Sequence, residues 1–296
     1  MLDRAPSTTS KYQNSFSRWR RWAVQHDLPY LPASGQHIAL YLVHLLKSAN
    51  SPAPIRDAVY GIAWAHKKAG YSSPTCHIFV QQVLQAALRV LSRRVKRKRP
   101  LSLSQVKLLF AKHDRPGASL TTLQSLLFII LGFSGFMRWN DLSNVKVENI
   151  RLGQSHMSIF LPMRKNDQFR EGGVLNFWRS GRPTCPVSMM ERFLARSQIS
   201  SGYLLRQTSS HQVSTKRLPY NKARNQFLQL LRSINVDPKS YGLHSLRSGG
   251  ASVAASAGAP GRLISRHGGW RSTAARNAYI KESASSQLFI PKMLGV

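Results

Sequence analysis

The chain has 296 residues and a formal charge of +32 at pH 7, because 43 Lys and Arg face only 11 Asp and Glu. A hydrophobic content of 42%, with 6 Trp and 12 Phe, supplies enough apolar side chains for packed cores and excludes a disordered basic tail. A folded chain with this excess of positive charge is expected to bind a polyanion, and nucleic acid is the usual one. A ribosomal or packaging protein would also fit the composition.

The cysteine count and the hydropathy of the chain exclude several further classes of protein. Only Cys76 and Cys185 occur, far apart and in no ligand spacing, which argues against a disulfide scaffold and a structural zinc site. No run of about eighteen apolar residues is present, so no membrane span is expected. The first residues, MLDRAPSTTSK, lack the apolar segment of a signal peptide. We therefore expect a soluble, intracellular chain.

Residues 1–92 have the pattern of a small bundle of helices separated by polar breaks. The first helix follows Ser7 or Thr8, either of which can cap it. Further helices are expected at 36–50, from 51 to about 68, and from 74 onward.

The first helix combines aromatic and basic side chains. Tyr12, Phe16 and Trp19 recur at helical spacing and are expected to pack in a core. The cations beside them are candidates for phosphate contacts, although a solvated helix face would have the same pattern. These candidates are Lys11, Arg18 and Arg21.

A basic run at 93–99, RRVKRKR, ends at Pro100 and separates this bundle from the rest of the chain. As a linker it would cross the nucleic-acid backbone between two domains, and as a nuclear-import signal it would serve equally well. A solvated charge run is the third interpretation. Its basic residues are Arg93, Arg94, Lys96, Arg97, Lys98 and Arg99.

The following region is predicted to be mostly helical with one small sheet. Ser102 begins it with a capping-box spacing to Gln105. Apolar periodicity then predicts a buried helix at 122–134, two hairpin strands at 157–161 and 174–177, and helices from 186 onward and at 221–235.

Residues suited to phosphate chemistry lie in two distant stretches. In the later stretch, His244 and Arg247 stand one turn apart at a helix start, where free backbone N–H groups also favour an anion. Trp270 and Tyr279 follow nine positions apart, and the tyrosine can fold back to the same place.

The earlier stretch, GFSGFMRWNDLSNV, follows the apolar helix and presents Arg138, with Asp141 one turn later. Taken alone, each candidate also has a structural interpretation. Arg138 and Asp141 could form a salt bridge at a helix end. His244 could cap a helix, and Trp270 and Tyr279 could pack in a core.

In this order the residues resemble the tyrosine recombinases, the family of phage integrases and Cre-like enzymes. The family pattern is Arg, a Lys in a β-hairpin, His-x-x-Arg, then His or Trp, and a Tyr nucleophile nine residues later. Lys165, in the segment LPMRKNDQFREG, matches the family lysine. The segment KNDQFREG is more similar to the recombinases of eukaryotic DIRS, Ngaro and Crypton mobile elements. The resemblance covers residues 100–281.

The resemblance implies metal-free cleavage of a DNA phosphodiester by the hydroxyl of Tyr279. Arg138 and Arg247 would neutralise the pentacoordinate phosphate, since guanidinium groups stay charged and hold two oxygens at once. Lys165 is the expected general acid for the leaving 5′ oxygen, and Arg164 is its nearest rival.

The remaining positions of the pattern receive supporting roles. His244 would accept the tyrosine proton or hold the scissile phosphate. Trp270 would donate its indole N–H to a phosphate oxygen and exclude water, with His267 as a competitor for this position. Asp141 would orient the arginines.

The implied architecture is a two-lobed DNA clamp, mostly α-helical with a small antiparallel β-sheet. Arg164 and Arg170, in the hairpin turn, join the expected DNA contacts. The apolar end of the chain could pack on its own domain or dock on a neighbouring subunit. The expected parts are a helical DNA-binding domain at 1–92, a basic linker at 93–100, an α+β catalytic domain at 101–281 and a tail at 282–296.

The expected function is site-specific DNA recombination through a covalent 3′-phosphotyrosine, in the integration or excision of a mobile element. The expected partners are double-stranded DNA and further copies of the chain, in a tetramer on two DNA sites, without membrane, metal or cofactor. Relaxation of DNA in the manner of a type IB topoisomerase is one alternative, and a non-catalytic DNA-binding protein derived from a recombinase is another. If the chain is eukaryotic we expect it in the nucleus, otherwise in the cytoplasm or nucleoid.

Overall fold

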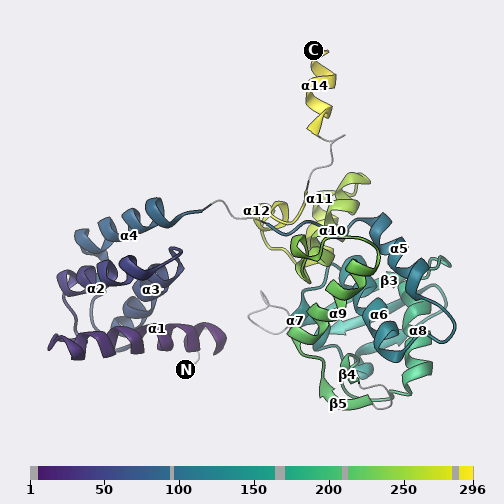
Figure 1. The fold of residues 1–296 in the computed structure, drawn as a ribbon, viewed down its shortest axis with the longest axis horizontal. Helices are drawn as coiled ribbons and strands as arrows, with labels where there is room; N and C mark the ends of the chain where they lie inside the picture. The colour runs from purple at the N-terminus through teal and green to yellow at the C-terminus, as the bar shows by residue number, and fades with distance from the viewer. Residues whose placement is uncertain (1–5, 94–96, 164–170, 209–212, 282–286, 296) are drawn as a thin grey trace. The chain divides into compact units, whose positions relative to one another are not determined.

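The computed structural model describes residues 6–93, 97–163, 171–208, 213–281 and 287–295. The chain divides into two compact units, residues 1–96 and 97–296 (Figure 1). Helices and small antiparallel sheets make up the described elements, which confirms the predicted mostly helical fold class.

The described part of the first unit is a helical bundle. Its apolar helix faces close over a core that includes the completely buried Trp19, Leu42 and Ile62. Ser7 and Thr8 lie inside the first helix and do not cap it, because the helix already begins at Pro6, whose missing N–H is no loss in a first turn. The elements are α1 (Pro6–Gln25), α2 (Gly35–Ser48), α3 (Ala53–Lys68), the short 3-10 helix η1 (Pro74–Cys76) and α4 (Ile78–Leu91).

The second unit places its helices around two small sheets. Its helices are α5 (Leu103–His113), α6 (Leu120–Ser134), α7 (Trp139–Ser143), α8 (Pro186–Ser197), α9 (Tyr220–Ser233), α10 (His244–Ser256), α11 (Gly261–Gly268), α12 (Thr273–Asn277) and α14 (Phe289–Leu294), with the 3-10 turns η2 (Val147–Asn149) and η3 (Pro238–Ser240). Its strands are β1 (Ile150–Leu152), β2 (His156–Leu161), β3 (Gly173–Trp178), β4 (Arg206–Thr208) and β5 (Val213–Arg217).

The larger sheet has the order β1-β2-β3, with antiparallel neighbours throughout. The pairs Met157–Phe177 and Ile159–Leu175 point to the buried face, as the alternating pattern of this hairpin predicted. The pairing of β4 with β5 was not predicted, because these short strands are largely polar and lack a two-residue apolar period.

Helix α6 forms the centre of the second core. Ser119 caps it by accepting the Thr122 N–H at 3.1 Å, and every side chain from Leu123 to Phe133 is buried. It contacts α5, α8, α9 and α10 (Figure 1), so its continuous apolar run is explained by neighbours on all sides. Its C-terminal end leads into the turn that presents Arg138.

Small residues let α10 lie directly on backbone. A Cβ at Gly249 would collide with the Leu101 carbonyl, and one at Gly250 would collide with the Phe133 carbonyl at the end of α6. The Leu101 N–H donates to the Ser245 carbonyl at 2.9 Å, which ties the start of the second unit to α10. These contacts fix α10 against the end of α6.

We therefore expect Gly250→Ala to lower the free energy of unfolding of the second unit by about 1–3 kcal/mol, the usual cost of overpacking. In an open helix the same change would stabilise by about 0.5–1 kcal/mol. Gly173→Ala is the control, because a Cβ there meets nothing within 4 Å. Urea unfolding followed by circular dichroism measures both, and a Gly250→Ala variant at least as stable as the parent would contradict the packing.

Candidate active site

Arg247 is the centre at which distant segments of the second unit meet. The residue is 1% exposed, and its Nη2 donates to the Gly268 carbonyl at 2.8 Å while its Nη1 donates to the Phe136 carbonyl. The guanidinium carbon lies 4.0 Å from the ring centroid of Trp270 and 4.9 Å from that of Tyr279. Three of the predicted site residues are thus brought into direct contact.

A buried guanidinium needs polar partners, because removing a charge from water is costly. Gly268 ends α11, so its carbonyl lies at the partially negative end of that helix. The other carbonyl belongs to Phe136, which has φ 45° in the turn after α6. Both oxygens bind the charge from fixed backbone positions, so the orientation of Arg247 is set without any ligand.

The Gly-Gly-Trp sequence explains how Trp270 reaches this centre. Gly269 has φ 64°, a left-handed conformation that suits glycine and ends α11. A Cβ at Gly268 would collide with the Trp270 ring, so the ring can fold back only onto glycine. Trp270 is consequently 6% exposed.

The Trp270 side chain carries an unsatisfied donor. Its Nε1 is buried and has no hydrogen-bond partner among the described residues. A buried N–H without an acceptor costs about 1–3 kcal/mol, so such a group needs a specific explanation. A phosphate oxygen placed beside Arg247 would supply the acceptor.

Tyr279 is positioned by the short helix α12. Ser272 caps this helix by accepting the Ala275 N–H at 3.2 Å, and the ring centroids of Tyr279 and Trp270 are 5.3 Å apart. Beyond the tyrosine, the Lys281 N–H donates to Ser252 Oγ on α10 at 2.8 Å. The half-buried Tyr279 is therefore held to α10 from its C-terminal side.

Arg138 is the residue that precedes α7, two positions after Phe136. Its Nη1 lies 3.8 Å from Asp141 Oδ2, and the two side chains are 13% and 4% exposed. The salt bridge that the sequence allowed is therefore present. Because Arg247 binds the Phe136 carbonyl, the turn that carries Arg138 is tied to the Arg247 centre.

The two predicted histidines have different surroundings. His244 is the first residue of α10, is exposed, and stands one helical turn before Arg247. His267 donates from Nε2 to the Ser134 carbonyl at 2.8 Å, and its ring meets Phe136 edge-on at a centroid distance of 4.7 Å. His267 thus anchors α11 to the end of α6, whereas Trp270 contacts Arg247 and Tyr279.

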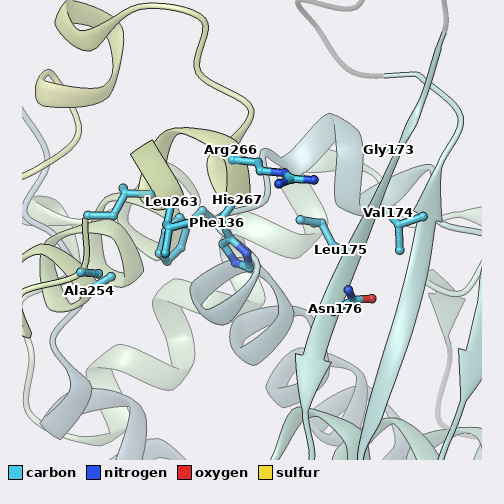
Figure 2. Close-up of a pocket in the computed structure, with 11 residues that line it drawn as sticks. Phe136, Gly173, Val174, Leu175, Asn176, Ala254, Leu263, Arg266 and His267 are labelled. Atoms are coloured by element: carbon cyan, nitrogen blue, oxygen red, sulfur yellow. The ribbon is translucent and has the colours of Figure 1, made fainter. Parts of the chain in front are cut away.

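A cavity of about 710 Å³ opens beside this centre. Figure 2 shows Phe136, Arg266 and His267 on one side and the β3 residues Leu175 and Asn176 on the other. The cavity therefore lies between β3 and the helices α10 and α11, and Arg247, Trp270 and Tyr279 are not among the residues that line it. The β2–β3 connection carries the predicted residues Arg164, Lys165 and Arg170, which lie outside the described residues.

Sequence reasoning missed Phe136, Arg266 and Asn176, which line this cavity. Only the Gly135–Phe136 dipeptide after α6 offered a signal, since glycine often ends a helix. No group of three or more His, Cys, Asp or Glu gathers as a metal site within the described part of the chain. In that part, no helix has the length and hydropathy needed to span a bilayer.

The predicted DNA contacts outside this centre are mostly exposed cations. Lys11 is exposed but forms a salt bridge, because its Nζ lies 2.7 Å from Asp57 Oδ1. Arg94 and Lys96 lie outside the described residues. The exposed cations are Arg18, Arg21, Arg93, Arg97, Lys98 and Arg99.

Comparison with known proteins identifies relatives over most of the chain. No family model matches the sequence. A 257-residue alignment is 25% identical to an integrase/recombinase XerD homologue of Selenomonas ruminantium and covers 85% of this chain and 74% of that protein.

Three solved structures share the fold. The XerH site-specific recombinase, bound to a palindromic difH substrate, has a TM-score of 0.61 at 13% identity and covers 95% of this chain and 76% of its own. The Tn1549 transposon integrase, in complex with transposon right end DNA, has a TM-score of 0.64 at 12% identity. The match covers 98% of this chain and 99% of that chain. A lambda integrase dimer bound to a COC′ core site has a TM-score of 0.55 at 15% identity. The match covers 94% of this chain and 72% of that chain. The chain thus has the fold of two-domain tyrosine recombinases.

The contact of His267 with α6 predicts a specific pair of variants. His267→Phe should lower the free energy of unfolding by about 1–3 kcal/mol, because the Ser134 carbonyl loses its donor. His267→Gln should lie closer to the parent, since its amide can donate to the same oxygen. Urea unfolding of the two proteins tests this. A Phe variant as stable as the parent, with the loss confined to Gln, would show that ring packing on Phe136, and not the hydrogen bond, holds α11.

Proposed function

We propose that this chain, a homologue of the tyrosine recombinases and integrases, cleaves and rejoins DNA strands through Tyr279. The observation that carries the proposal is the convergence of Arg247, Trp270 and Tyr279 from three separate segments. The tyrosine ring lies beside a buried guanidinium and an unsatisfied indole N–H. A phosphodiester would bring a negative charge beside the guanidinium and an acceptor oxygen for the indole N–H.

The reaction conserves the phosphodiester bond energy. The Tyr279 oxygen attacks phosphorus, the bond from phosphorus to the 5′ oxygen breaks, and a 3′-phosphotyrosine forms. His244 takes the phenol proton and Lys165 protonates the leaving 5′ oxygen. Attack by the 5′ hydroxyl of another strand reverses these steps, so rejoining requires no ATP, metal or cofactor.

The arginines would stabilise the charge of the transition state. Arg247 is already oriented by two backbone carbonyls, so it loses little freedom when phosphate binds. Arg138, next to the same turn, supplies the second guanidinium, and Asp141 orients it. Removal of one such fixed donor typically costs roughly 2.7–4 kcal/mol of barrier.

The coverage of both units by two-domain recombinases supports recombination over the type IB topoisomerase alternative. The presence of every residue of the pattern speaks against a purely DNA-binding descendant. We further propose action on a mobile element by a tetramer on two DNA sites. The hairpin segment KNDQFREG supports the eukaryotic mobile-element type, and the basic run 93–99 supports a nuclear location.

Tyr279→Phe should abolish the covalent protein–DNA adduct and leave DNA affinity unchanged, because only the attacking oxygen is lost. A pool of nicked duplexes of randomised sequence, incubated with chelator and resolved on a denaturing gel, measures the adduct. Tyr241→Phe is the matched control, since Tyr241 is buried and its hydroxyl accepts from Gln105 Nε2 at 2.9 Å. An adduct that persists in Tyr279→Phe would remove the nucleophile assignment, and its loss in chelator alone would remove metal independence.

Trp270→Phe should slow adduct formation by roughly ten- to a hundredfold, because a hydrogen bond to a charged group contributes about 1.5–3 kcal/mol. Trp270→His should recover part of this rate, since imidazole also carries an N–H donor. Single-turnover adduct formation at saturating DNA measures both variants. A Phe variant as fast as the parent would show that the indole N–H does not contact the reacting phosphate.

A further inference from the structure

The second unit contains another cavity, of about 210 Å³, between α9 and η3. Its lining is separate from the lining of the cavity beside Arg247. It is formed by Arg224, Asn225, Leu228, Arg232, Pro238 and Lys239.

Three cations converge on this cavity. Arg224 and Arg232 lie eight positions apart on one face of α9, with Leu228 between them. Lys239 approaches from η3. Within the described residues, none of these three side chains has an ion pair, and no acidic residue lines the cavity.

The nearest acid in the chain is occupied by its own turn. Asp237 Oδ1 accepts the Lys239 N–H at 3.0 Å, and Asp237 Oδ2 accepts the Ser240 hydroxyl at 3.3 Å. This carboxylate therefore caps η3, and it is not among the residues that line the cavity. The local charge imbalance matches that of the whole chain, which is +32.

The end of the basic linker lies against η3, next to this cavity. The Arg99 N–H donates to the Ser240 carbonyl at 2.8 Å, and Lys98 Nζ donates to the Lys239 carbonyl. The end of the linker is therefore fixed along η3. Like charges held together in this way repel one another unless an anion lies between them.

We propose that this cavity binds a backbone phosphate of the DNA on which the second unit acts, an inference that rests on the proposed function. Two guanidinium groups and an ammonium group suit the oxygens of a phosphodiester. The linker cations extend the positive surface beyond the cavity, which suits a continuous polyanion better than a single free phosphate. Only Tyr241, Gly242 and Leu243 separate η3 from His244, so a phosphate held here positions the duplex relative to α10.

Salt dependence of DNA affinity tests the site. We expect the Arg224→Gln/Arg232→Gln variant of the full chain to bind a short duplex more weakly. Its plot of log affinity against log salt should be shallower by about 0.9 for one lost phosphate contact. The control is Arg151→Gln/Arg196→Gln, which removes the same charge at exposed residues of β1 and α8 and should leave the slope closer to that of the parent. Equal slopes for the two double variants would overturn the site.

Two further measurements separate the possible explanations. Arg224→Lys/Arg232→Lys keeps both charges and should retain the parent slope, whereas a loss equal to that of the Gln variant would point to a folding defect and overturn the site. In calorimetric titration with inorganic phosphate, we expect the parent protein and the Gln variant to behave alike, because the site is proposed to bind DNA and not free phosphate. If phosphate binding is lost while the DNA slope is unchanged, the cavity is a free-phosphate site and the DNA assignment is wrong. Adduct formation by the parent protein tests Tyr279 independently of all these results.

Discussion

Burial of the Arg247 guanidinium is the constraint on which the second unit depends. A charge that is 1% exposed must find oxygen partners, and it finds them in carbonyls 111 and 21 positions away in the chain. Those two bonds connect α10 to the turn after α6 and to the end of α11. The same guanidinium lies over the rings of Trp270 and Tyr279. The hydrogen bonds that hold these segments of the second unit together are consequently also the ones that assemble the candidate site.

Such bonds require backbone segments to approach more closely than side chains normally allow. Gly250 permits α10 to rest on the end of α6, and Gly268 permits the Trp270 ring to fold back. Gly269 supplies the left-handed residue that turns the chain towards Trp270. Gly250 and Gly268 therefore act indirectly, because a Cβ at Gly250 would collide with the end of α6 and one at Gly268 with the Trp270 ring.

The sequence predicted those features that side-chain pattern determines. The apolar run of α6, the alternation in β2 and β3, and the capping box at Ser102 all follow from local periodicity or spacing, and the structure contains each of them. The partners of Arg247 could not be predicted in this way, because a carbonyl oxygen has the same identity at every residue. The positive φ of Phe136 is likewise set by packing after α6 and not by residue type. Lys165 stays a prediction, since it lies outside the described residues.

Composition alone predicted a polyanionic partner, but it could not divide the cations by role. Arg247 is buried and hydrogen-bonded, so the interaction with a phosphate that we propose for it would act at short range and be weakly screened by salt. The cations around α9 and the linker are largely exposed, and their attraction falls as ionic strength rises. On the proposed function, salt would separate the two groups, because it would weaken the capture of DNA by the surface cations and have little effect on the buried charge of Arg247. A highly basic chain can in this way combine loose, reversible attraction over its surface with a fixed, salt-insensitive centre at Arg247.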